Sequence, residues 1–250
     1  MNKILTVYGI RPVLELLDTN QEIQRIYIQK NIKSENIIKI KKKANEKYIE
    51  TKSVPIYKLN KLTNKNHQGV VAISSPISFV NFENYLPTVY EKGEVPIFVL
   101  LDRITDVRNF GSICRSCEAL GAHGIIIPNK ESAPINEIAI KTSAGSIAKI
   151  PICKSNNLIE TLNFAKKSGL ALCSMSEQSK KNFFDIDLLK PTIIILGSEK
   201  NGISKKILDI SDSIGTIPIF GEIESLNVSV AAGIALSELV RQRIKHNSSW

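Results

Sequence analysis

Cysteine is scarce in this chain of 250 residues, which contains only Cys114, Cys117, Cys153 and Cys173. So few cysteines exclude a fold that depends on disulfide bonds at this length. Cys114 and Cys117 form a C-x-x-C pair, but neither a second pair nor a nearby histidine completes a zinc site. Since the pair lies in a predicted helix over residues 113–120, we interpret both as small buried thiols and expect no metal.

Long apolar stretches are also missing. No run approaches the roughly 18 residues that span a bilayer, and the N-terminal stretch lacks the apolar core and cleavage site of a signal peptide. The apolar fraction of 43% is that of an ordinary globular protein. We therefore expect a cytoplasmic protein without a membrane partner, containing one large domain or two modest ones.

Two common phosphate-binding motifs are absent as well. No Walker-type Gly-Lys-Ser/Thr loop is present, and the loop from Gly197 to Gly202 carries Glu199 where a dinucleotide fingerprint has its second glycine. A carboxylate there repels a pyrophosphate, which disfavours a nicotinamide dehydrogenase. The same carboxylate suits a cationic or hydroxyl-bearing ligand, and S-adenosylmethionine, with its sulfonium, ammonium and ribose groups, fits that requirement.

Positive charge is concentrated in the first third of the chain. Residues 1–80 carry 14 Lys and Arg against 6 Asp and Glu, whereas residues 81–250 carry 19 against 18. The first segment therefore has a surplus of +8 out of a net charge of +9. This asymmetry is typical of a segment that contacts phosphates, although a lysine-rich surface without function accounts for the charge equally well.

The pattern of elements predicts two domains joined by a linker, with boundaries at residues 1–76, 77–92 and 93–246. The first part alternates short elements and predicts a small α/β domain, with strands over residues 23–28, 54–59 and 70–73 and helices over residues 9–17 and 34–47. The linker has weak periodicity and two prolines near it, and it holds at most a short helix.

The last part alternates continuous apolar strands with helices, which predicts a parallel sheet covered on both faces. The expected strands are residues 95–102, 124–127, 170–174, 192–196 and 215–219, and the expected helices are residues 111–120, 136–147 and 158–167. In such a fold the ligand lies at the carboxyl ends of the strands.

Three polar, glycine-containing junctions each follow an apolar run of this last part. They are Asn109-Phe-Gly-Ser-Ile-Cys-Arg115, Gly197-Ser-Glu199-Lys-Asn-Gly202, and the stretch from Ile217 through Gly221, Ser225 and Asn227 to Ser229. Taken in this order, the three resemble the signature motifs of the SpoU branch of the SPOUT RNA 2′-O-ribose methyltransferases. The N-terminal stretches Val7-Tyr-Gly-Ile-Arg-Pro-Val and His67-Gln-Gly-Val-Val-Ala are similar to the first domain of its RlmB-type members, so the resemblance covers essentially the whole chain.

The resemblance implies a parallel α/β catalytic domain whose C-terminal chain is threaded into a trefoil knot, and a homodimer built through the knotted region. It also implies that the N-terminal domain is similar to a small RNA-binding ribosomal protein and presents the RNA substrate. The implied reaction moves a methyl group from S-adenosylmethionine to a ribose 2′-hydroxyl, most directly of a guanosine in large-subunit (23S) rRNA.

The same resemblance implies the roles of five residues. Arg115 takes the central catalytic role, either as a base or as a stabiliser of the developing alkoxide, and the second role is easier for a guanidinium. The other implied catalytic residues are Asn109, Glu199, Ser225 and Asn227. Taken singly, these four also fit turn, cap or early-helix positions.

Cofactor contacts are implied mainly for the backbone of Leu196, Gly197, Gly202, Ile217, Ile219 and Leu226. Core packing explains the apolar members of this set equally well. Of the histidines, His67 fits the N-terminal family pattern and is a candidate RNA contact.

Three alternatives to a ribosomal guanosine methyltransferase remain at this point: a tRNA 2′-O-methyltransferase, an adenosine-specific resistance methyltransferase, and a non-catalytic RNA-binding or ribosome-assembly protein. The intact set of five implied catalytic residues argues against the last of these.

Overall fold

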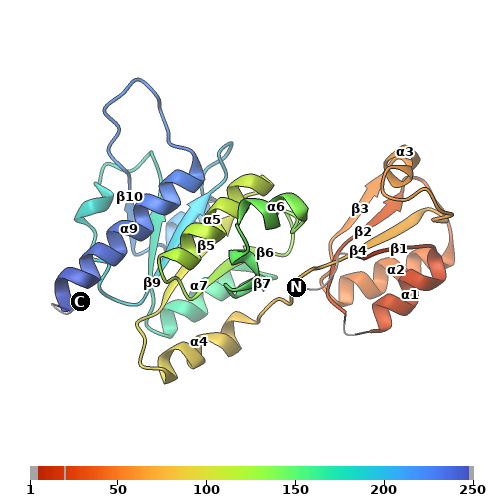
Figure 1. Ribbon diagram of the computed structural model, residues 1–250, viewed down its shortest axis with the longest axis horizontal. Coiled ribbons are helices and arrows are strands. Elements are labelled where there is room, and N and C mark those ends of the chain that lie inside the picture. Colours follow the sequence, from red (N-terminus) through yellow and green to blue (C-terminus); the bar gives the residue numbers. More distant parts are fainter. Residues whose placement is uncertain (1–4, 20, 248–250) are drawn as a thin grey trace. The chain divides into compact units, whose positions relative to one another are not determined.

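The computed structural model describes residues 5–19 and 21–247, and the chain divides into two compact units between Ser78 and Phe79 (Figure 1). Each unit has its own β-sheet and its own apolar core. Within the described residues, no helix is both long and apolar enough to cross a membrane.

The described residues of the first unit form a four-stranded sheet with three helices. Its elements are β1 (Thr6–Tyr8), α1 (Ile10–Asp18), β2 (Ile23–Gln29), α2 (Glu35–Glu46), β3 (Thr51–Val54), α3 (Ile56–Asn60) and β4 (Val70–Ser74). The strand order is β1-β4-β2-β3, with β4 antiparallel to both β1 and β2 and with β3 parallel to β2.

Alternation along the central strand β4 assigns the helices to opposite faces of this sheet. Val70 and Ala72 belong to the apolar core that includes α1 and α2. Val71, between them, belongs to a second small core with Val54 and with Leu59 of α3. Because successive strand residues point to opposite faces, α1 and α2 cover one face and the short helix α3 lies on the other.

The strand predicted over residues 54–59 is wrong. The strand β3 ends at Val54, and Pro55 occupies the position just before α3. Proline at a helix start has its fixed φ already in the required range and loses no intrahelical hydrogen bond. The apolar residues that suggested a strand are instead one buried helix residue, Leu59, and one half-exposed residue, Ile56.

The second unit is built on a six-stranded sheet in which each described pair of neighbours is parallel. Its strands are β5 (Ile97–Asp102), β6 (Gly124–Pro128), β7 (Ile152–Ser155), β8 (Ala171–Met175), β9 (Thr192–Gly197) and β10 (Ser213–Gly215). Its helices are α4 (Phe82–Glu91), α5 (Val107–Ala119), α6 (Glu137–Thr142), α7 (Leu158–Lys167), α8 (Lys205–Ile210) and α9 (Val228–Asn247), with short 3₁₀ turns at Ser146–Ala148 and Phe183–Asp185.

The strands of this sheet lie in the order β10-β8-β9-β5-β6-β7. Helices cover both of its faces (Figure 1). On one face, Phe98, Leu100 and Ile193 pack with side chains from α4, α7 and α8. Val99 and Ile194 are neighbours of these residues along β5 and β9, so their side chains point to the other face, where they are fully buried. On that face α5 packs with α6 and α9. The prediction of an α/β fold with a parallel sheet covered on both faces is confirmed.

The segment predicted as a linker, residues 77–92, consists mainly of the helix α4. Phe82, Leu86 and Val89 are almost fully buried in the core of the second unit, and Asn81 Oδ1 accepts a hydrogen bond from the backbone N–H of Asn84 at the start of the helix. The spacing of the three apolar residues is helical, and it was obscured by Pro87, which the helix accommodates.

Two other predicted elements end earlier than expected. The helix predicted over residues 136–147 stops at Thr142, because Ala144 and Gly145 take left-handed backbone conformations before the 3₁₀ turn. The last strand, expected over residues 215–219, is β10 and ends at Gly215. Thr216 forms only an isolated bridge with Asn182, and the chain then runs without regular structure to Asn227.

A single arginine on α9 joins the last helix to the opposite, amino-terminal edge of the sheet. The guanidinium of Arg243 donates to the carbonyl oxygens of Val95 (2.7 Å), Lys190 (2.8 Å), Leu188 (3.2 Å) and Pro96 (3.3 Å). Burial lowers the pKa of Arg243 to about 10, which leaves the group charged at neutral pH.

We expect Arg243→Lys to lower the free energy of unfolding of the second unit by about 1–3 kcal/mol. The ammonium group of lysine lacks the planar fork of N–H donors with which the guanidinium reaches the four carbonyls. The measurement is urea unfolding followed by circular dichroism. Lys245→Ala, which removes an exposed cation from the same helix, is the control and should leave the midpoint in place. Equal midpoints for the two variants would contradict the role assigned to Arg243.

Candidate functional site

The three predicted junctions meet at one edge of the six-stranded sheet. Asp102, Met175, Gly197 and Gly215 are the last residues of β5, β8, β9 and β10. Because these strands are parallel, their carboxyl ends lie at the same edge, which is the edge where open α/β sheets bind ligands.

A polar network joins the three junctions. Glu199 Oε1 accepts hydrogen bonds from Asn109 Nδ2 at 2.8 Å and from Asn227 Nδ2 at 2.9 Å. Asn227 Nδ2 also donates to Asn109 Oδ1 at 3.0 Å. One carboxylate oxygen thus holds two carboxamides that come from distant parts of the sequence.

Asn227 also forms the start of helix α9. Its Oδ1 accepts from the backbone N–H of Ser229 at 2.9 Å and from the Ser229 hydroxyl at 2.6 Å. Both ends of the amide are therefore engaged, which fixes its orientation. The cap interpretation and the site interpretation of Asn227 hold together, because the oxygen serves the helix and the nitrogen serves the network.

The start of helix α5 positions Asn109. Asp106 caps the helix, and its Oδ1 accepts from the backbone N–H groups of Arg108 (2.9 Å) and Asn109 (2.8 Å). Two residues further on, Gly111 allows α6 to approach closely, since a Cβ atom there would lie 2.7 Å from the carbonyl oxygen of Ala139. The helix begins at Val107, earlier than predicted, and Asp106 rather than Asn109 is the cap.

The loop that carries Glu199 folds back on itself. The backbone N–H of Gly202 donates to the carbonyl of Ser198 at 2.8 Å, and Gly202 has a φ of +59°. A Cβ atom on Gly197 would lie 2.1 Å from the carbonyl carbon of Gly202. Both glycines are therefore required by the turn itself, and Glu199 lies in this turn rather than in an early helix.

An ion pair that sequence reasoning missed joins the end of β5 to the second junction. Asp102, only 3% exposed at the end of β5, accepts from Arg103 Nε at 3.0 Å and Nη2 at 3.1 Å, and from the backbone N–H of Ser204 at 2.7 Å. Arg103 Nη2 also donates to the carbonyl of Gly202 at 3.3 Å. The hydrogen bond to Asp102 raises the pKa of Arg103.

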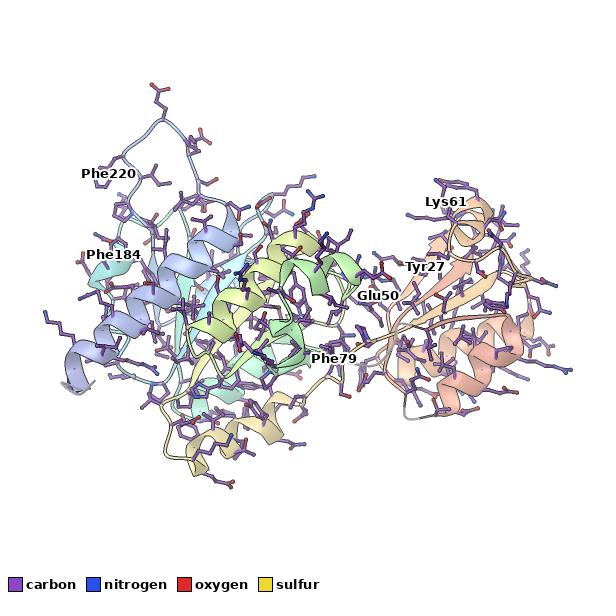
Figure 2. The ribbon with its side chains drawn as sticks, viewed as in Figure 1. Tyr27, Glu50, Lys61, Phe79, Phe184 and Phe220 are labelled. Atoms are coloured by element: carbon purple, nitrogen blue, oxygen red, sulfur yellow. The ribbon has the colours of Figure 1, made fainter. Side chains whose placement is uncertain are left out.

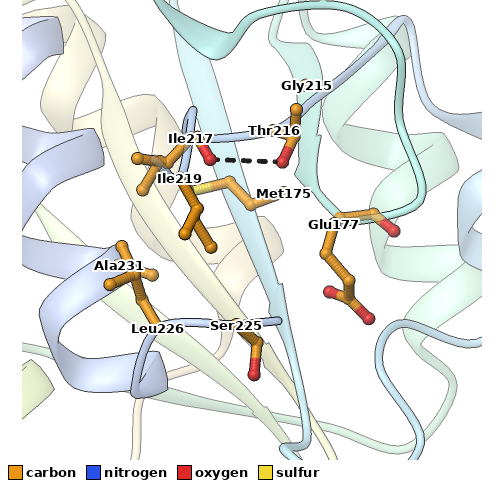
Figure 3. A pocket seen from close by; sticks show the side chains of 10 residues that line it. Met175, Glu177, Gly215, Thr216, Ile217, Ile219, Ser225, Leu226 and Ala231 are labelled. Atoms are coloured by element: carbon orange, nitrogen blue, oxygen red, sulfur yellow. Dashed lines mark hydrogen bonds between the residues drawn. The ribbon is translucent and has the colours of Figure 1, made fainter. Parts of the chain in front are cut away.

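A hollow of about 390 Å³, open to solvent, lies beside the chain that follows β10 (Figure 3). Ile217, Ile219 and Leu226, three of the predicted cofactor contacts, line it, and so does Ser225. The other lining residues are Met175, Ser176, Glu177, Gly215, Thr216 and Ala231. Apolar side chains, exposed backbone and one carboxylate therefore share this space.

Four predicted residues lie elsewhere. Leu196 is 2% exposed within β9, and among the described residues that line the hollow neither it nor Gly197 nor Gly202 appears. Arg115 is exposed on α5, and in the described part of the chain we find no hydrogen bond to its guanidinium. It lies six residues beyond Asn109, about 240° around an ideal helix axis.

The residues missed by sequence reasoning follow a simple rule. Met175, Ser176 and Glu177 directly follow the apolar run of β8, and Asp102 and Arg103 stand at the end of β5. Polar residues at the carboxyl end of a predicted parallel strand were therefore the available signal.

All four cysteines are buried and free, which confirms the interpretation of Cys114 and Cys117 as buried thiols. Burial raises the pKa of Cys153 and of Cys173 to about 12 and raises the pKa of Cys114 and Cys117 as well. Thiols of this kind are poor nucleophiles at neutral pH. Across the residues that the structure describes, no group of His, Cys, Asp and Glu side chains is arranged to hold a metal ion.

Comparison with known proteins gives matches over both units. Residues 96–237 match the model of the SpoU rRNA Methylase family, and residues 6–80 match the model described as RNA 2′-O ribose methyltransferase substrate binding. A Staphylococcus haemolyticus protein assigned to the TrmH family of tRNA/rRNA methyltransferases is 31% identical over 239 residues, which is 96% of each chain. The Bacillus subtilis protein YacO, assigned to the same family, is 31% identical over 240 residues and 95% of each chain.

Solved structures agree with these matches. The SpoU methyltransferase AviRb from Streptomyces viridochromogenes, in complex with the cofactor AdoMet, has a TM-score of 0.60 and 25% identity, covering 97% of this chain and 91% of its own. A TrmH/SpoU tRNA modifying enzyme from A. aeolicus has a TM-score of 0.57 and 32% identity, over 66% of this chain and 85% of its own.

We expect Arg103→Gln to loosen the loop of residues 198–204. The variant loses the charge-assisted bond to Gly202, so amide hydrogen exchange at Gly202 and Ser204 should become about tenfold faster. Hydrogen exchange followed by mass spectrometry or NMR measures this.

Lys166→Gln is the matched control. Lys166 Nζ binds Asp212 at 2.8 Å and the carbonyl of Ile210 at 2.9 Å, and Asp212 accepts from the backbone N–H of Leu172 at 2.8 Å. This pair has the same construction but lies at the amino-terminal edge of the sheet. Exchange in the loop 198–204 that responds equally to both substitutions would contradict a local role for Arg103.

Proposed function

Because the chain belongs to the SpoU rRNA methylase family, we propose that it transfers a methyl group from S-adenosylmethionine to a ribose 2′-hydroxyl of RNA, most directly of a guanosine in large-subunit rRNA. The observation that carries the proposal is the network of Asn109, Glu199 and Asn227 beside the hollow lined by Ser225 and Leu226. Family membership supports RNA methylation in general. The network supports the proposed location of the reaction within the second unit.

The residues that line the hollow fit S-adenosylmethionine in their chemistry. Ile217, Ile219 and Leu226 offer apolar walls for an adenine ring, and Glu177 offers a carboxylate for hydroxyl or ammonium groups. When bound, the cofactor supplies an electrophilic methyl group on a sulfonium.

The chain's own residues perform the remaining chemistry. A ribose 2′-hydroxyl is a weak nucleophile that must lose its proton as it attacks, so a base or a stabiliser of the alkoxide is required. We assign Arg115 to the second role, since a guanidinium stabilises a developing negative charge and grips a neighbouring phosphate without losing a proton. Asn109 and Asn227, fixed by Glu199, hold the site in one geometry for the ribose.

The first unit is the proposed RNA-binding domain. Its surplus of +8 and its match to the substrate-binding model over residues 6–80 both support this role. The choice of rRNA over tRNA rests on this domain. The chain's relatives include proteins assigned to tRNA/rRNA methylation, so a tRNA substrate is the alternative, and a non-catalytic RNA-binding protein is a second one.

A knotted chain and a homodimer complete the proposal. The segment that follows β10 exposes large apolar side chains, among them Phe220 (98% exposed) and Ile223 (Figure 2). Exposed apolar side chains gathered on one loop are typical of a protein interface. We assign this loop to the dimer contact, and the threading of the C-terminal chain to the knot that the family resemblance implies.

We expect purified protein to transfer label from methyl-labelled S-adenosylmethionine to one guanosine of large-subunit rRNA taken from cells that lack the gene. Arg115→Ala should reduce the rate at least about 100-fold, the effect of removing one stabiliser of developing charge, while cofactor binding by calorimetry stays unchanged. Arg115→Lys keeps the charge but loses the fork and should recover only part of the rate.

Lys149→Ala, which removes an exposed cation from the same unit, is the control and should retain full activity. Label in tRNA alone would overturn the rRNA substrate and leave the chemistry. Cofactor binding without transfer to either RNA would contradict catalysis on mature RNA, and failure to bind the cofactor would favour the non-catalytic alternative.

A further inference from the structure

The positive charge of the first unit is divided between two surfaces. Helix α2 carries exposed Lys39, Lys41 and Lys42 on one face of the sheet. Residues 56–65, which contain α3 and are called the α3 segment, carry exposed Lys58, Lys61 and Lys65 on the other face. RNA recognition by this unit therefore has two possible faces, and the structure gives reasons to choose between them.

Carboxylates are distributed very unevenly between these surfaces. Residues 51–82 contain four lysines and no Asp or Glu. The side of α1 and α2, by contrast, carries four carboxylates, from Glu15, Asp18, Glu35 and Glu46, and Asp18 Oδ1 binds Lys43 Nζ at 2.5 Å. The nearest acidic residue in sequence to the α3 segment, Glu50, is occupied by Arg25 at 2.5 Å and by Lys52 at 3.5 Å.

The α3 segment also exposes an aromatic ring among its lysines. Tyr57 is 61% exposed, and Lys61 follows it by four residues, so both occupy the same face of the helix. Lys65 Nζ lies 5.7 Å from the centre of the Tyr8 ring, and Lys61 projects from the end of α3 (Figure 2). An exposed ring flanked by ammonium groups is the arrangement that stacks an unpaired base and holds its phosphate.

Buried contacts hold this segment rigid. Leu59 is fully buried in the small core with Val54 and Val71. His67, predicted as a candidate RNA contact, is buried and uses both ring nitrogens. Its Nδ1 accepts from the backbone N–H of Gly69 at 3.0 Å, so its Nε2 donates to Asn60 Oδ1 at 2.8 Å. The histidine thus fixes the end of α3 and is not available to RNA.

We infer that the α3 surface, defined as Ile56, Tyr57, Lys58, Lys61 and Lys65, binds an unpaired stretch of the RNA substrate, with a base stacked on Tyr57 and phosphates against the lysines. The inference rests on the proposed function, in which the first unit binds RNA. It adds which face does so and which form of RNA it selects. Stacking requires an unpaired base, so single-stranded RNA should bind this surface better than a duplex.

The test uses the full chain and two probes, a labelled oligouridine and a blunt duplex RNA of the same length, with affinity measured by anisotropy across a salt series. The triple variant Lys58→Gln, Lys61→Gln, Lys65→Gln should weaken oligouridine binding. Its plot of log affinity against log salt should become shallower by about 2, as expected for three lost phosphate contacts on a single strand. The control Lys39→Gln, Lys41→Gln, Lys42→Gln removes the same charge from α2 and should keep the wild-type slope.

The aromatic contribution is tested separately. Tyr57→Ala should weaken oligouridine binding by about tenfold or more, with an unchanged salt slope and little effect on the duplex. Tyr48→Ala is the matched control, because Tyr48 is 63% exposed but lies at the end of α2.

Thermal unfolding of each variant checks that the fold is intact. These exposed side chains contribute little to stability, so the unfolding temperatures should stay close to that of the wild type. A slope that changes with the α2 variant and not with the α3 variant would overturn the inference while RNA binding by the first unit stands. Equal losses for oligouridine and duplex with Tyr57→Ala would also overturn it. Failure of the wild-type chain to bind either RNA, or to methylate any, would remove the proposed function itself.

Discussion

The Glu199 carboxylate is the contact on which the geometry of the site depends. It accepts hydrogen bonds from two carboxamides that are far apart in the sequence, Asn109 on a helix start and Asn227 on a loop end. Hydrogen bonds to an ionised acceptor are about twice as strong as neutral ones. Removing this side chain would leave the bond from Asn227 to Asn109 as the remaining hydrogen bond between the two carboxamides.

A close backbone approach and an ion pair put the Glu199 carboxylate in place. Gly197 lets the chain of Gly202 pass at a distance that no side chain permits, so the loop turns back within a few residues. The buried Asp102 then fixes the other end of the loop through Ser204 and, by way of Arg103, through Gly202. A loop held at both ends projects Glu199 at a defined point, which a flexible loop of the same sequence would not do.

The sequence predicted the architecture of the second unit well because its strands are continuous apolar runs and its junctions contain glycine. Predictions failed where one residue carries two meanings. Pro55 marks a helix start but was read within a strand, and Pro87 obscured the apolar spacing of α4. The network of Asn109, Glu199 and Asn227 followed from motifs, whereas Arg103 and Glu177 did not, because their importance depends on which strand ends are neighbours in the sheet.

The two units differ strongly in net charge. The second unit has a surplus of only +1 over residues 81–250, so its net charge gives RNA little long-range attraction. In the proposed function, the first unit, with a surplus of +8, supplies the long-range attraction for RNA. Long-range attraction falls as salt screens it, whereas the short hydrogen bonds of Glu199 are affected much less. Under that proposal, substrate capture depends on salt, whereas the geometry of the hydrogen-bonded network depends on it much less.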